Sequence, residues 1–188
     1  MTKTIDWAKL ANELGTLSDN GECGSSTSAC EAIEKIIGEQ NIRDAVDYYI
    51  DGGRGSELAR YVIWQIHPWS SMEYCYEIYK KDNDLERKIS AVELLRVAAD
   101  KRVIPWITEF LLDSNKQIQG WGIGIVDQLL WSELVEEDEM TELLELAESV
   151  GGKHLSDGVD FIRAFLQIRK RNKKIIQDLD DEDKFKRK

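Results

Sequence analysis

The side chains that most often carry out catalysis are few in this sequence. Only two histidines occur, His67 and His154, and neither has a cysteine or carboxylate at the spacing of a metal site. Cys75 and His67 are the one candidate pair of nucleophile and base, since such partners need only be close in space. Cys75 lies between two tyrosines, in a setting more typical of a buried thiol. We therefore expect a protein that is not an enzyme and that uses no metal or cofactor.

Three glycines, Gly120, Gly122 and Gly124, spell the GxGxG pattern found in some phosphate-binding loops. A loop of that kind follows a strand and leads into the N-terminus of a helix, and no strand pattern precedes these residues. We predict instead that the glycines lie along a helix. There a missing side chain lets a neighbouring helix approach closely, at a cost of roughly 1 kcal/mol of helix propensity for each glycine.

The charge distribution indicates the class of binding partner more clearly than any motif does. The chain has 36 acidic and 25 basic residues and a formal net charge of −11, and residues 117–152 contain nine acids without a single Lys or Arg. Charges of one sign add into a field that repels phosphate and attracts cations. The sequence therefore predicts a basic protein partner and no direct contact with nucleic acid. An acidic surface that only keeps the protein solvated is the alternative.

Six tryptophans are many for 188 residues, and aromatic side chains both fill cores and anchor interfaces. We expect Trp64 in the core. Trp69 falls in a predicted turn, while Trp106 and Trp121 lie beside the apolar stripes of their helices, so these three are the candidates for exposure.

The elements that must position these residues are predicted to be helices throughout. Two prolines and glycines placed mostly between periodic segments favour a helical fold over a turn-rich β fold. No apolar run approaches a membrane span of about 18 to 20 residues, and Lys3, Asp6 and Lys9 stand where a signal peptide would be apolar. Three cysteines without CxxC spacing suit a reducing compartment. We therefore expect a soluble cytoplasmic protein without a membrane partner.

The clearest helical periodicity lies between residues 84 and 131. Asp84 is a predicted N-cap, and the helix that follows shows an apolar stripe that includes Leu95. Pro105 suits the first turn of the next helix, whose inward residues include Leu111 and Leu112. Upstream, Pro68 ends one helix, and Ser70 with Glu73 forms a capping-box signature for the next.

Two further helices complete the expected domain over residues 1–175. The helix at 136–149 turns its acids outward, and the last helix begins near Ser156. Its predicted inward residues are Val159, Ile162, Phe165, Leu166 and Ile168. Residues 176–188 alternate acidic and basic blocks and are predicted to form a charged tail.

The segment from Lys88 to Asp113 resembles a HEAT repeat. The matching positions are Ala91, Leu95, Asp100, Val103, Ile104, Pro105, Leu111 and Asp113. A second unit begins in register at Gln119, about 31 residues after Lys88, although Gln119 replaces a basic residue and Trp131 the turn aspartate. The resemblance implies an all-α, right-handed stack of antiparallel helix pairs, about ten helices in all, whose second helices line one concave face.

This resemblance and the acidic charge together lead us to expect a non-catalytic protein-binding module. In size, charge and compartment the chain is similar to bacterial immunity proteins that bind and neutralise basic nuclease toxins, as in contact-dependent growth inhibition. The expected partner-binding residues are Trp69, Glu73, Tyr76, Trp106, Glu109, Trp121, Glu133, Glu137, Asp138 and Glu142. The alternative is a HEAT-repeat protein associated with enzymatic chemistry, such as a bilin lyase subunit or a DNA glycosylase-like enzyme. The glycosylase would need a basic groove.

Overall fold

The computed structural model describes residues 4–18, 21–22 and 25–186 and divides into two compact units. Unit 1 extends as far as Trp106, and unit 2 begins at Ile107. Ten α-helices occur in the part of the chain that is described, which confirms the expected all-α fold. The prediction of a single domain over residues 1–175 stays a prediction, and each unit is described by itself.

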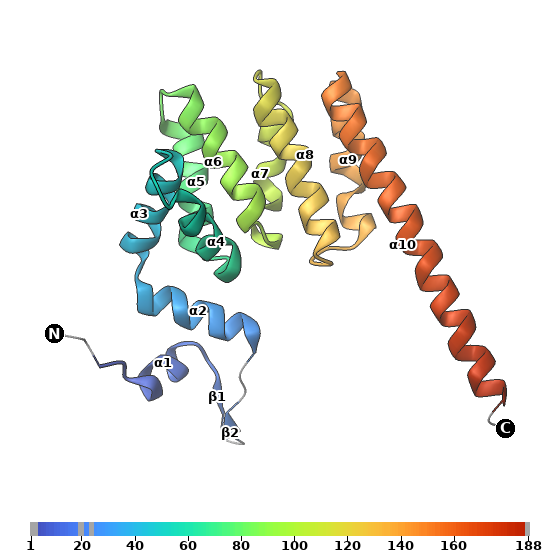
Figure 1. The fold of residues 1–188 in the computed structure, drawn as a ribbon, viewed down its shortest axis with the longest axis horizontal. Coiled ribbons are helices and arrows are strands. Elements are labelled where there is room, and N and C mark those ends of the chain that lie inside the picture. The colour runs from blue at the N-terminus through green and yellow to red at the C-terminus, as the bar shows by residue number, and fades with distance from the viewer. Residues whose placement is uncertain (1–3, 19–20, 23–24, 187–188) are drawn as a thin grey trace. The chain divides into compact units, whose positions relative to one another are not determined.

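Unit 1 is built mainly from two helix pairs joined by short connections. The helix α3 packs against α4, and α5 packs against α6 (Figure 1). A two-residue β-ladder, β1 with β2, is the only β-structure in the described residues of the unit. The elements are α1 (Trp7–Glu13), β1 (Leu17–Ser18), β2 (Gly21–Glu22), α2 (Ser26–Ile37), α3 (Glu39–Ile50), α4 (Ser56–Ile66), α5 (Trp69–Lys81), α6 (Leu85–Ala98) and the 3-10 turn η1 (Lys101–Val103).

The core of unit 1 lies around α6. Asp84 caps this helix by accepting a hydrogen bond from the backbone N–H of Glu86, as predicted. Leu95 is fully buried, and Ile89, Val92 and Ala98 on the same helix are also buried. The prediction for Trp64 is wrong, because its side chain is 44% exposed. The inner face of α4 is formed by Ile63 and Ile66. Trp64 follows Ile63 directly, so it is turned about 100° from that residue around the helix axis.

The link from α4 to α5 contains a residue in a strained backbone conformation. His67 has φ +43° and ψ +52°, a left-handed conformation that costs a non-glycine residue roughly 1–2 kcal/mol. Its ring Nδ1 lies 2.9 Å from the carbonyl oxygen of Ala98, and Pro68 begins α5. The histidine therefore ends one helix and ties the turn to the end of α6.

Unit 2 contains most of α7 (Ile104–Leu111), whose first three residues belong to unit 1, followed by α8 (Lys116–Trp131), α9 (Glu137–Val150) and α10 (Lys153–Lys186). Leu111 is fully buried, as predicted, whereas Leu112 is 58% exposed and its inward assignment is wrong. The buried residues of α9 are Met140, Leu143, Leu144 and Ala147, and none of its acids is buried, as predicted. The helix α10 packs against both α8 and α9 (Figure 1).

The three glycines of the GxGxG pattern lie within α8, as predicted. At Gly122 an added Cβ would come within 2.9 Å of the Phe110 Cβ, whereas at Gly120 it would meet no atom within 4 Å. The missing side chain at Gly122 therefore permits the close approach of α7 and α8, whereas the one at Gly120 has no such role.

The helix α10 departs from the prediction at both ends. It begins at Lys153 and continues to Lys186, so it extends through most of the segment expected to be a charged tail. Ile168 is 60% exposed, and its assignment to the buried stripe is wrong. The residues that do face the core are Leu155, Val159, Ile162 and Leu166.

Across the described residues, none of the helices combines the length and apolar character that crossing a membrane requires.

Candidate functional site

Three aromatic side chains of unit 1 form a continuous stack, which we call the aromatic ladder: Trp69, Trp106 and Tyr76. Trp69 and Tyr76 are seven residues apart on α5, which places them on one face with about 10.5 Å of helix between them. Trp106 in α7 fills that interval, with ring centroids 5.4 Å from Trp69 and 4.3 Å from Tyr76. All three side chains are half-buried. The ladder therefore joins α5 to the start of α7 and stays open to a partner on its outer side.

Cations lie near both ends of the aromatic ladder. The guanidinium carbon of Arg102 is 4.8 Å from the ring centroid of Trp69, and the Lys80 ammonium is 5.8 Å from that of Tyr76. Asp100 accepts hydrogen bonds from Arg102, and this contact raises the pKa of the guanidinium. Because stacking occupies the ring faces, ring edges and a fixed guanidinium are what the ladder presents. Trp, Tyr and Arg are the residue types that dominate the energetics of protein interfaces.

The position of Trp69 depends on a contact with a distant helix. Glu34 in α2 accepts hydrogen bonds from the backbone N–H groups of Trp69 and Ser70 at 3.0 and 2.9 Å, and from the Ser70 hydroxyl at 2.6 Å. A carboxylate at a helix N-terminus satisfies unpaired N–H groups and complements the helix dipole. The predicted capping box of Ser70 with Glu73 is therefore wrong, since Ser70 lies inside α5 and Glu34 takes the capping role.

In unit 2 the acids of the cation-free segment are partly neutralised by α10. Ion pairs join Glu137 to Lys170, Glu133 to Arg169 and Glu148 to Arg163. Asp138, Glu142 and Glu145 are exposed and make no ion pair with any other residue that the structure describes. Fewer acids are therefore available to a partner than the sequence indicates.

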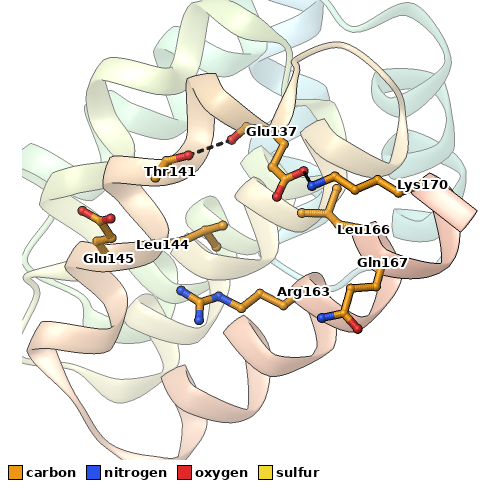
Figure 2. A pocket seen from close by; sticks show the side chains of 8 residues that line it. All are labelled: Glu137, Thr141, Leu144, Glu145, Arg163, Leu166, Gln167 and Lys170. Carbon is orange, nitrogen blue, oxygen red and sulfur yellow. Dashed lines mark hydrogen bonds and ion pairs between the residues drawn. The ribbon is translucent and has the colours of Figure 1, made fainter.

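A shallow pocket of about 290 Å³ lies between α9 and α10. Figure 2 shows Glu137 on α9 meeting Lys170 of α10, and Arg163 extending from α10 toward α9. The Thr141 hydroxyl donates a hydrogen bond to the backbone carbonyl of Glu137. Lys170 is held by Glu137 and Arg163 by Glu148, so the charges at this pocket largely satisfy one another. The lining residues are Glu137, Thr141, Leu144, Glu145, Arg163, Leu166, Gln167 and Lys170.

The structure brings together some of the sequence-predicted interface residues and separates others. Trp69, Tyr76 and Trp106 meet in the aromatic ladder, and Glu73 is exposed on the same helix as two of them. The remaining six lie in unit 2, where Glu109 and Trp121 are half-buried and Glu133, Glu137, Asp138 and Glu142 lie at or near the start of α9. A surface that joins the two groups stays a prediction.

The candidate nucleophile is poorly suited to catalysis. Cys75 is 1% exposed, and desolvation raises the pKa of its thiol well above the ordinary value, which disfavours the reactive thiolate. His67 is engaged with the Ala98 carbonyl, and His154 Nε2 lies 2.6 Å from Gln119 Oε1. Cys23, the first cysteine in the sequence, lies outside the described residues. Within the described residues no cluster of side chains suits a metal ion.

Several residues that shape these surfaces were missed by sequence reasoning. Arg102, Glu34 and Lys170 each act on a residue that is distant along the chain, and nothing in their immediate sequence marks the partner. The only usable signal was the excess of basic residues in the last helix beside a segment that has none.

Comparison with protein-family models, curated proteins and solved structures finds no match to this chain. The resemblance to HEAT repeats therefore depends on the sequence pattern and stays a prediction.

Proposed function

We propose that this chain is a non-catalytic protein-binding module whose partner is a basic protein. The observation that carries the proposal is the outer side of α9. Asp138, Glu142 and Glu145 are exposed there and have no ion-pair partner among the described residues, whereas neighbouring acids are neutralised by α10. Unpaired carboxylates on one helix produce a local negative field, which attracts a basic surface and speeds its association.

The aromatic ladder supports protein binding through a different contribution. Ring edges and an oriented guanidinium supply contact area at a small cost in side-chain entropy, because stacking already restricts the rings. We assign the affinity to this surface and the association rate to α9. Each surface is defined within its own unit.

In its most specific form, the proposal is that the protein neutralises a basic nuclease toxin, as bacterial immunity proteins do. The net charge of −11 and the unpaired acids of α9 support a basic partner over nucleic acid. An enzymatic role is less well supported, since the one candidate nucleophile is a buried thiol with a raised pKa. The HEAT-like arrangement of the helices remains part of the proposal.

The test begins with affinity capture from the native host and purification of the captured protein. Association is then measured for the wild type and for the double variant Asp138→Lys/Glu142→Lys. We expect the variant to associate more slowly, and the wild-type rate to fall with added salt, because exposed charges are screened over about 8 Å at physiological ionic strength.

The matched control is Asp44→Lys/Glu86→Lys, which changes the net charge equally at exposed positions of unit 1. If both double variants slow association to the same extent, net charge alone acts and α9 is not the docking face. An unchanged rate for the α9 variant would contradict the proposal. The toxin form is tested by co-expression, in which the wild-type protein should rescue growth from the captured partner more fully than the α9 variant.

A further inference from the structure

The long helix α10 has an apolar stripe that the rest of unit 2 does not cover. Its core-facing side is formed by Leu155, Val159, Ile162 and Leu166. A second set, Phe161, Ile168 and Ile175, recurs every seven residues and is 64%, 60% and 48% exposed. At about 100° per residue, this second set lies on the side of α10 opposite the core-facing residues. We call it the outward stripe.

A large aromatic contact widens the outward stripe near its middle. Trp131 at the end of α8 is 65% exposed, and its ring lies 5.1 Å from that of Phe165, which is four residues after Phe161 and three before Ile168. A mostly exposed Trp or Phe leaves roughly 100–160 Å² open to solvent. Together these residues expose roughly a few hundred Å² of apolar surface, about the size of the largest apolar patch on a typical monomer, which is often functional.

Unpaired charges of opposite sign flank the two halves of the outward stripe. Asp157 and Asp160 adjoin Phe161, and Arg171 and Lys174 adjoin Ile175. No ion pair links any of these four to another described residue. Three other cations of α10 form ion pairs within unit 2: Arg163, Arg169 and Lys170.

We propose that the outward stripe binds a second copy of this chain, with the two α10 helices antiparallel. Antiparallel packing places Asp157 and Asp160 of one chain beside Arg171 and Lys174 of the other, twice over. It also brings Phe161 and Ile168 of both stripes together between the charged ends. A pattern complementary to its own reverse is what a two-fold symmetric interface requires.

A parallel arrangement is opposed by the same charges, because it would place acid beside acid and base beside base. Access to the stripe is favoured by the length of α10, which has 34 residues against 14 in α9 and extends past it (Figure 1). The seven-residue spacing is also that of helices that pack along a shared seam. The exposed apolar area is modest for a dimer, so we expect a dissociation constant of about micromolar.

The test is sedimentation equilibrium of the full chain across micromolar concentrations. The wild type should show a monomer–dimer equilibrium, and Ile168→Asp should remain monomeric with an unchanged helical circular dichroism spectrum. Asp157→Lys/Asp160→Lys should also be monomeric, and so should Arg171→Glu/Lys174→Glu. The quadruple variant that combines these four charge reversals should dimerise again, because each acid then faces a base in the antiparallel pair.

Each alternative outcome is distinct. A wild type that stays monomeric at every concentration overturns the proposal. Dimerisation that neither charge pair weakens indicates parallel packing or another surface, and it overturns the antiparallel assignment. Failure of the quadruple variant to regain association, with its helical content intact, shows that these charges do not lie opposite one another.

Discussion

The two glycines Gly120 and Gly122 provide a direct test of how α7 and α8 pack. Both lie in α8, so replacement by Ala gains the same helix propensity at each, about 1 kcal/mol. At Gly120 the new Cβ meets open space, and we expect stabilisation by about 0.5–1 kcal/mol. At Gly122 it meets the Phe110 Cβ at 2.9 Å and the Leu111 backbone nitrogen at 3.4 Å. Neither atom is the end of a flexible side chain, so the helices must separate, at a cost of roughly 1–3 kcal/mol.

The informative quantity is the difference between the two variants, since the propensity gain cancels in it. We expect Gly122→Ala to be less stable than Gly120→Ala by about 1–3 kcal/mol. Urea unfolding followed by far-ultraviolet circular dichroism measures this difference, and equal m-values would show that the same unfolding transition is compared. Equal stabilisation by both substitutions would refute the close approach of α7 to α8 at Gly122.

Two further predictions concern the core and the acid response. Leu95→Ala and Leu111→Ala should each destabilise by about 2–5 kcal/mol in urea unfolding, because both side chains are fully buried; losses below about 0.5 kcal/mol at both would contradict the packing. The pKa of Asp82 lies below its ordinary value, because the Asp84 backbone N–H and the Arg87 side chain donate hydrogen bonds to its carboxylate. Its contribution to stability is therefore present above the unfolded pKa of about 3.9 and lost as the pH falls through the lower folded pKa. The destabilisation caused by Asp82→Asn should shrink as urea unfolding is repeated from pH 7 toward about pH 2, and a constant difference would argue against this linkage.

The helices could be predicted from sequence because their signals are local. The stripe of α6 and its cap at Asp84 lie within a few residues of one another, and Pro105 indicates a first turn from its own chemistry. Trp64 shows where this reasoning fails. It is one residue from the buried Ile63, and a hydrophobic side chain in a helix does not reveal from its type which side meets the core.

The candidate surfaces were less predictable because their contacts are distant along the chain. The aromatic ladder required Trp106 to enter the interval between Trp69 and Tyr76, which depends on how α5 meets the start of α7. The cap on α5 comes from Glu34, 35 residues before Trp69, and displaces a local motif that suited the same role. Residue types alone identified three members of the ladder but not their arrangement.

The acidic segment shows most clearly how folding changes the meaning of a charge pattern. Along the chain, nine acids have no cation nearby, whereas in the structure α10 lies beside α9 and supplies Lys170 to Glu137 and Arg163 to Glu148. A partner that binds through charge must therefore meet the acids that α10 leaves unpaired. The cations of α10 also fall into a paired and an unpaired group. Those that face α9 form ion pairs within unit 2, whereas Arg171 and Lys174 beside the outward stripe form none with a described residue. Because a pair within the unit offers little to a partner, the unpaired acids of α9 and the unpaired charges of α10 are the places where recognition is expected.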